Sequence, residues 1–165
     1  MKKLTLIRHG KSSWDDPSLS DWERPLNDRG KKDILLIGYK LAEENIIPDK
    51  IISSSAKRAY DTAKRIAECI NYHESEIAIT DDIYLAAINQ LIQIIQNLND
   101  DWKHVFLFGH NPYFTEFANM FGKININNLP TTGIYQITFY CDKWEDISKD
   151  NGKNTYFLTP KELKE

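Results

Sequence analysis

The chain has 165 residues, of which 41% are hydrophobic, and a formal net charge of −3. This length predicts one domain, residues 1–165, with a sizeable buried core. The charge balance lacks the basic excess of nucleic-acid-binding proteins, and the longest apolar runs are too short to span a membrane. Two cysteines, Cys69 and Cys141, are too few for a disulfide framework, so we expect a reducing, cytoplasmic location.

Strand-like and helix-like patterns alternate along the chain. In order, they predict a strand at 3–7, a polar loop at 11–27, a helix at 28–45 capped by Asn27, a strand at 50–54, a helix at 56–70, a short strand at 76–80, a helix at 89–98, a strand at 105–108, a helix at 112–121, and two strands typical of a sheet edge at 134–141 and 155–158. This order predicts an α/β fold, a three-layer α/β/α sandwich whose central sheet is mainly parallel, with a mixed edge.

Polar side chains follow three of the predicted strands where each strand ends. Arg8 and His9 follow the first strand, Arg58 lies just beyond the second, and His110 follows the strand at 105–108. Functional sites in parallel α/β folds gather at the carboxyl ends of the strands. We therefore expect these four side chains to meet at one edge of the sheet.

The four residue types suit the transfer of a phosphoryl group. Imidazole is both neutral and nucleophilic near pH 7, so His9 is the candidate nucleophile, with its tautomer fixed by neighbouring backbone. Arg8 and Arg58 offer fixed forks of donors for the phosphoryl oxygens, and His110 can donate to another oxygen. Gly10 would leave room for close approach of the backbone, as would Gly109.

Each feature also has a plainer interpretation. An Arg-His pair at a strand end is often structural, and Arg58 could be a solvated residue at a helix start. His9 and His110 could bind a metal, but no neighbouring carboxylate or cysteine completes a ligand set. We expect His73 and His104 to be solvated surface residues. The joint placement of the four site residues is what favours catalysis.

Three motifs of the chain resemble those of a known family. Residues 6–10, Leu-Ile-Arg-His-Gly, are similar to the signature of the histidine phosphatase superfamily, also called the phosphoglycerate mutase-like superfamily. Residues 53–63 and 109–112 are similar to its second and third motifs. Within the superfamily, residues 11–15, 24–26 and Gly30 resemble the SixA-type phosphohistidine phosphatases. The resemblance implies that His9 becomes phosphorylated, and that Arg8, Arg58 and His110 form the phosphate pocket.

The usual proton donors of the superfamily are missing. Mutase-like relatives carry a glutamate after the third strand, where residues 83–88 here contain no acid, and the phytase-like branch has an aspartate where this chain has Asn111. An alkoxide leaving group, about as basic as hydroxide (conjugate acid pKa ~15.7), needs a proton donor. A protonated imidazole with a pKa of about 6.5 leaves neutral without one. Asp15 could serve as a substitute acid or organise its loop.

These observations predict a metal-independent phosphatase that hydrolyses phosphohistidine through phospho-His9, with no cofactor. The expected partner is a phosphorylated protein such as a phosphotransfer domain, or a small phosphorylated molecule, with no nucleic acid and no membrane. The alternatives are a small-molecule phosphomonoesterase of the same superfamily and a non-catalytic phosphate-binding module.

Overall fold

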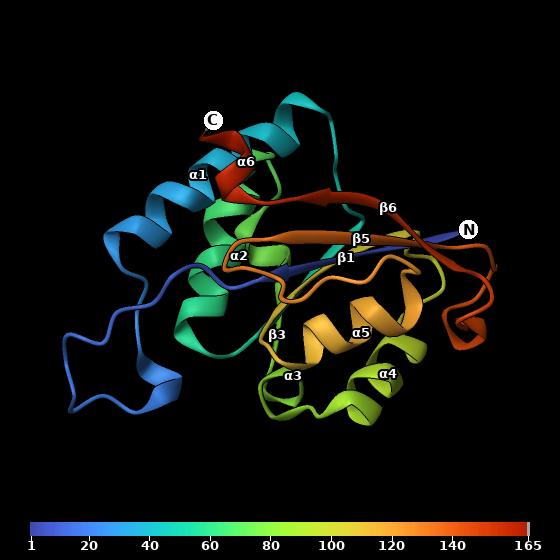
Figure 1. The fold of residues 1–165 in the computed structure, drawn as a ribbon, viewed down its shortest axis with the longest axis horizontal. Coiled ribbons are helices and arrows are strands. Elements are labelled where there is room, and N and C mark those ends of the chain that lie inside the picture. The colour runs from blue at the N-terminus through green and yellow to red at the C-terminus, as the bar shows by residue number, and fades with distance from the viewer. Residues whose placement is uncertain (165) are drawn as a thin grey trace.

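The structure is a computed structural model that describes residues 1–164. Its strands and α-helices, in chain order, are β1 (Lys2–Arg8), α1 (Asp28–Glu43), β2 (Lys50–Ser54), α2 (Lys57–Cys69), β3 (Ala78–Thr80), α3 (Asp81–Leu85), α4 (Ile88–Gln96), β4 (His104–Gly109), α5 (Tyr113–Phe121), β5 (Ile134–Phe139), β6 (Gly152–Leu158) and α6 (Pro160–Leu163) (Figure 1). Three short 3₁₀ helices, η1 (Asp21–Glu23), η2 (Glu74–Glu76) and η3 (Trp144–Asp146), lie between them.

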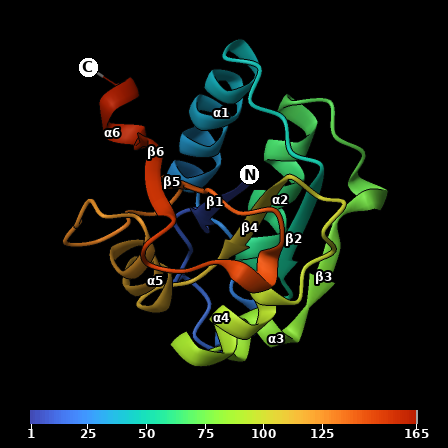
Figure 2. The ribbon, with the colours of Figure 1, turned by 90° about the vertical axis from the view of Figure 1, so that its right-hand side faces the viewer.

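The six strands form one sheet in the order β3-β2-β4-β1-β5-β6. The pairs β3–β2, β2–β4 and β4–β1 are parallel, whereas β5 is antiparallel to both β1 and β6. Helices α1 and α2 cover one face, and α3, α4 and α5 cover the other (Figures 1 and 2). The predicted three-layer α/β fold with a mainly parallel sheet and a mixed edge is confirmed.

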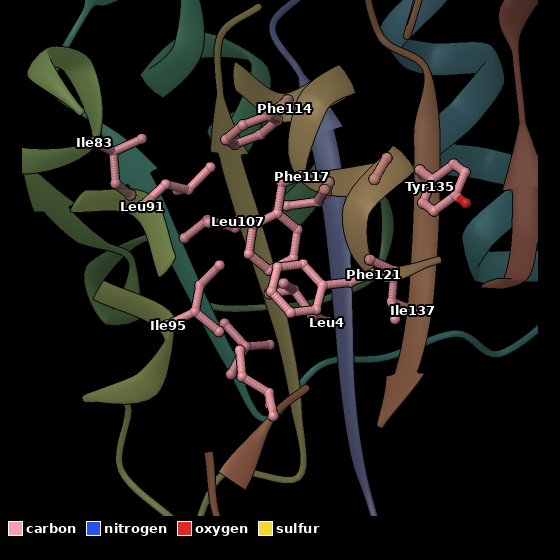
Figure 3. Packing of buried hydrophobic residues seen from close by; sticks show 14 of the residues in the cluster. Leu4, Ile83, Leu91, Ile95, Leu107, Phe114, Phe117, Phe121, Tyr135 and Ile137 are labelled. Carbon is pink, nitrogen blue, oxygen red and sulfur yellow. The ribbon is translucent and has the colours of Figure 1, made fainter. Parts of the chain in front are cut away.

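The central strands are buried on both faces, which explains the continuous apolar run at 105–108 in β4. Successive side chains of a strand point to opposite faces. In β1, Leu4 and Leu6 therefore join the core under α4 and α5, while Ile7 joins the core under α1 and α2. In the first of these cores, Phe114 and Phe117 of α5 lie over the sheet beside side chains from α4 (Figure 3).

Asparagines lie at both ends of α1 and at the C-terminal end of α2. The Asn27 side chain accepts a hydrogen bond from the Gly30 N–H and caps α1. After α1, Asn45 adopts a left-handed conformation (φ 56°), and the N–H groups of Asn45 and Ile46 bond back to the last turn. Asn71 (φ 58°) ends α2 in the same way.

Some boundaries and short elements differ from the prediction. The strand predicted at 134–141 is not an edge strand, because β5 is fully buried between β1 and β6. The short helices α3 and α6 were not predicted, and residues 74–76 form a 3₁₀ turn before a shorter β3. Within residues 1–164, no helix combines the length and apolarity needed to cross a bilayer.

Candidate active site

The carboxyl ends of three neighbouring parallel strands bring the predicted residues together. His9 follows β1, His110 follows β4, and Arg58 lies in the first turn of α2, directly after β2. The His9 N–H donates to the Gly109 carbonyl over 3.1 Å, and the ring centres of His9 and His110 are 5.2 Å apart. The polar loop between β1 and α1 extends from the same end of the sheet (Figure 1). The expected convergence on one sheet edge is confirmed.

His9 is buried and held as a neutral ring. Only 8% of the residue is exposed, and its Nδ1–H donates to the Gly10 carbonyl over 2.8 Å. Burial and, to a smaller extent, the nearby His110, Arg58 and Arg8 lower the pKa of His9 to about 3, against the opposing effect of the Gly10 bond. No hydrogen-bond partner within residues 1–164 occupies Nε2. The backbone thus fixes the tautomer as expected and leaves Nε2 as the free nucleophilic atom.

Three nitrogen atoms around His9 are buried and have no hydrogen-bond partner within residues 1–164. They are Arg8 Nε, Arg58 Nε and His110 Nδ1. Arg8 is fixed by a 3.0 Å bond from Nη1 to the Leu129 carbonyl. Buried N–H groups are nearly always paired, and charged donors pair most strongly with carboxylate or phosphate oxygens. The arrangement is therefore suited to binding an anion beside the His9 ring.

The Ser54 hydroxyl sets the tautomer of His110. Ser54 Oγ lies 2.8 Å from His110 Nε2 and accepts a 3.2 Å bond from the Ala56 N–H. Its own proton is then available for Nε2, which leaves the ring proton on Nδ1. Burial lowers the pKa of His110 to about 4, and the Arg58 charge adds to this. A neutral His110 with a proton on Nδ1 can donate to a bound oxygen.

The structure adds two residues that the sequence did not assign to the site, Asp21 and Tyr84. Asp21 Oδ2 lies 3.0 Å from Arg58 Nη2 and accepts a 2.8 Å bond from the Tyr84 hydroxyl. The Asp21 carbonyl accepts a further bond from Arg58 Nη1 over 2.6 Å. Arg24 donates to Asp21 Oδ1 from Nε (3.3 Å) and Nη2 (3.1 Å). Asp21 therefore lies directly against Arg58.

The two aspartates of this loop differ in their surroundings. Burial alone would raise the pKa of Asp21, but the bonds from Tyr84, Arg58 and Arg24 outweigh it and lower that pKa to about 2. Asp21 is therefore ionised at neutral pH. Asp15 is exposed, and its backbone N–H donates to the Ser13 hydroxyl over 3.1 Å. The structure places Asp21, and not Asp15, in contact with Arg58.

A small cavity of about 140 Å³ adjoins His110. Its walls come from α3, α4, the turn after β4 and the start of α5, and they are mostly apolar: Ile83, Tyr84, Leu85, Ala86, Leu91, His110, Asn111, Tyr113 and Phe114. The edge of the Tyr84 ring faces the His110 ring, with centres 5.5 Å apart. The cavity therefore adjoins one of the four predicted site residues, His110.

The structure contradicts two further predictions, those for Gly109 and His104. The space beside Gly109 is filled by the Phe114 ring, so this glycine serves core packing and not approach to a ligand. His104 is not a solvated surface residue, because it is largely buried and its Nε2 lies 2.7 Å from the Thr5 hydroxyl. Among residues 1–164, no group of three or more His, Cys, Asp or Glu side chains could hold a metal ion.

Known proteins match both the sequence and the fold. The family model of the histidine phosphatase superfamily (branch 1) matches residues 4–85. An uncharacterized chloroplastic protein of Arabidopsis thaliana is 30% identical over 95% of this chain and 75% of its own length. Phosphoserine phosphatase 1 of Hydrogenobacter thermophilus is 40% identical over 80 residues, which are 43% of this chain and 34% of that protein.

The fold matches that of the protein histidine phosphatase SixA complexed with tungstate, with a TM-score of 0.81 and 20% identity over 98% of this chain and 99% of the other. The family model covers the motif around His9, and the Arabidopsis relative covers 95% of this chain. The chain belongs to the histidine phosphatase superfamily, branch 1.

Proposed function

We propose that this protein is a phosphatase that hydrolyses phosphohistidine, presented on another protein, through a covalent phospho-His9 intermediate and without a metal. The observation that carries the proposal is the set of unpartnered buried nitrogens of Arg8, Arg58 and His110 around the neutral ring of His9. Membership in the histidine phosphatase superfamily supports a phosphatase in general.

In the first step, the lone pair of His9 Nε2 attacks phosphorus while the bond from phosphorus to the leaving group breaks. The Gly10 carbonyl stabilises the positive charge that develops on the ring, because it already accepts the Nδ1–H bond. Arg8, Arg58 and His110 hold the three equatorial oxygens as their charge is redistributed. In the second step, water attacks phospho-His9, and phosphate and a proton are released while His9 returns to its neutral form.

The protonation states of Asp21 and Tyr84 favour phosphohistidine over a phosphate ester as the substrate. Asp21, the carboxylate that contacts Arg58, is ionised, since its pKa is about 2. Burial and the Asp21 charge raise the pKa of Tyr84 above its ordinary value, so that hydroxyl is a poor proton donor. An alkoxide leaving group needs a donor, whereas an imidazole protonated on its distal nitrogen does not.

Comparison of kcat/KM for a phosphohistidine peptide, a phosphoserine peptide and an aryl phosphate tests this function. We expect phosphohistidine to be preferred over phosphoserine by on the order of 10²-fold or more, the range that general acid catalysis contributes. We also expect turnover to persist with a chelator. Preference for the alkyl ester, or loss of activity with chelator alone, would overturn the proposal.

A small-molecule phosphomonoesterase is the second candidate function. The partial match to phosphoserine phosphatase 1 favours it, and Asp15 would then be the proton donor. In that case Asp15→Asn should abolish turnover of the alkyl ester and leave aryl phosphate turnover nearly unchanged, because an aryl leaving group needs no proton.

A further inference from the structure

Asp21 is an unexpected residue at a site for a dianion. Its ionised carboxylate lies 3.0 Å from Arg58 Nη2, where it repels a bound phosphoryl group and competes with it for the arginine. Four donor contacts hold it there, from Arg58, from the Tyr84 hydroxyl and two from Arg24. A position held by so many contacts indicates that the charge is used when substrate binds.

The position of Asp21 relates it to the leaving group. Tyr84 both lines the cavity beside His110 and donates its hydroxyl to Asp21 Oδ2. The carboxylate is therefore held next to a wall of the cavity in which a leaving group would lie. The Asp21 side chain is 51% exposed, so its oxygens remain accessible to a group that enters from solvent.

We propose that Asp21 binds the leaving group: its carboxylate accepts a hydrogen bond from the distal ring N–H of the substrate phosphohistidine, whose imidazole occupies the cavity beside His110. This inference rests on the proposed phosphohistidine function. It assigns a substrate-recognition role to a residue that holds the phosphate-binding arginine in the unliganded protein.

Substrate binding then becomes an exchange of ion pairs. The phosphoryl oxygens take over the Arg58 N–H groups, which frees a lone pair on Asp21 Oδ2. The distal N–H of the protonated imidazole then donates a hydrogen bond to Asp21 Oδ2. Arg58 is thus paired with the phosphoryl group, and Asp21 with the substrate ring. A phosphate ester supplies only the anionic half and leaves Asp21 facing a dianion, which costs binding energy.

The same contact assists the chemical step. As the His9 Nε2–P bond forms, the bond from phosphorus to the substrate nitrogen breaks and its electron pair stays on that nitrogen. The distal nitrogen already carries a proton, so the imidazole leaves neutral. An ionised Asp21 favours this protonated form of the ring in the complex, as an aspartate favours the imidazolium in a catalytic triad.

The test compares Asp21→Asn with Asp16→Asn, using a phosphohistidine peptide and an aryl phosphate. Asp16 lies on the same loop, is exposed, and its side chain accepts hydrogen bonds only from Ser18 within the described residues. We expect Asp21→Asn to lower kcat/KM for phosphohistidine by about 10- to 100-fold, as for one lost charged hydrogen bond. Aryl phosphate turnover should stay unchanged or rise, because a repulsive charge is removed. Asp16→Asn should leave both substrates within about twofold.

The pH dependence provides a second measurement. The charged and titratable groups that face Asp21 are Arg24, Arg58 and Tyr84, and its charge also acts on His110. An ionised Asp21 raises the pKa of the bound substrate ring, so the high-pH limb of kcat for phosphohistidine should move to lower pH in Asp21→Asn, by about one unit. The aryl phosphate profile should not show this shift.

The kinetic results distinguish a leaving-group role of Asp21 from a role in positioning Arg58 alone. Parallel losses with both substrates would show that Asp21 only positions Arg58, and would overturn the inference while the phosphohistidine function stands. If the unsubstituted protein does not turn over phosphohistidine at all, both proposals fail. Asp21→Ser, which also removes the charge, replaces Asp21→Asn if that variant does not fold, and the same opposed effects on the two substrates are expected.

Discussion

Two ends of the same sheet hold buried histidines, and they differ in how their hydrogen bonds are satisfied. At the carboxyl ends of the strands, the pKa of His9 is about 3 and that of His110 about 4. At the opposite end, burial lowers the pKa of His104 to about 4 as well. His104 Nε2, however, lies 2.7 Å from the Thr5 hydroxyl and 3.4 Å from Gln136 Nε2.

The difference between the two ends lies in the unpaired donors. Within the described residues, the carboxyl end contains buried nitrogens of Arg8, Arg58 and His110 without partners, whereas neither His104 ring nitrogen is both buried and unpaired. A lowered histidine pKa reports burial in both places. Unsatisfied buried donors mark the end of the sheet that is built to receive an anion.

The largest expected effect separates the two kinds of histidine. His9→Ala should lower kcat for an aryl phosphate by on the order of 10³-fold or more, because the nucleophile is lost. His104→Ala is the matched control. It should cost about 1–3 kcal/mol of unfolding free energy by removing the 2.7 Å hydrogen bond to the Thr5 hydroxyl, yet keep kcat per folded molecule. Equal kinetic losses in both variants would break the comparison.

The next effect concerns the anion-binding donors. Arg58→Ala should lower kcat/KM by about 10²- to 10³-fold, as for removal of one preorganised donor to the transition state. Arg65 lies about two turns further along α2, away from His9, so Arg65→Ala should change kcat/KM less than about twofold. Steady-state kinetics with an aryl phosphate checks both variants. A small effect of Arg58→Ala would show that its buried Nε does not bind the phosphoryl group.

The three buried histidines also predict a pH-dependent stability. Their pKa values fall from 6.5 in the unfolded chain to about 3 for His9 and about 4 for His104 and His110. Between about pH 4 and 6.5, the unfolded state therefore binds more protons than the folded state. The unfolding free energy rises with pH across this window, so the protein loses stability as the pH falls.

Each histidine contributes a slope of about 1.4 kcal/mol per pH unit. His104→Ala should therefore reduce the slope of unfolding free energy against pH by about 1.4 kcal/mol per pH unit. Urea unfolding at several pH values between 4.5 and 6 measures this slope. An unchanged slope would mean that His104 is not buried as a neutral ring, and would remove one side of the comparison.

The smallest expected effects are on stability alone, at the two ends of α1. Asn27→Ala removes the side chain that caps α1 and should cost about 1 kcal/mol of unfolding free energy. Asn45→Gly, at the other end of α1, keeps the left-handed conformation accessible and should change stability by no more than about 0.5 kcal/mol. Both should leave kcat unchanged, in contrast with the site variants.

Local patterns in the sequence predicted the parts of the fold that local physics determines. The central strand at 105–108 is a continuous apolar run because both faces of the sheet are covered there. The predicted cap Asn27 is at the start of α1, whereas the predicted end at residue 45 lies two residues beyond the observed one. The five-residue helix α3 is too short to show helical periodicity, although Thr80 caps it through a bond from the Asp82 N–H.

The remaining site residues depend on long-range contacts. Asp21 meets Arg58 across 37 positions and Tyr84 across 63, which no local pattern reveals. A local signal did exist, because Ser20 and Glu23 have the spacing of a capping box and form one at the start of η1. His104 was misjudged because its partners Thr5 and Gln136 come from strands β1 and β5, which only the assembled sheet brings beside it.

The most direct test of the central claim is to trap the phosphoenzyme. The protein is mixed with a phosphohistidine peptide, quenched in alkali, and its own peptides are mapped by mass spectrometry. We predict an alkali-stable, acid-labile phosphate on His9 that is absent from His9→Ala and decays as free phosphate appears. Turnover of phosphohistidine without phosphate on His9, or labelling of another residue at the rate of turnover, would contradict the account.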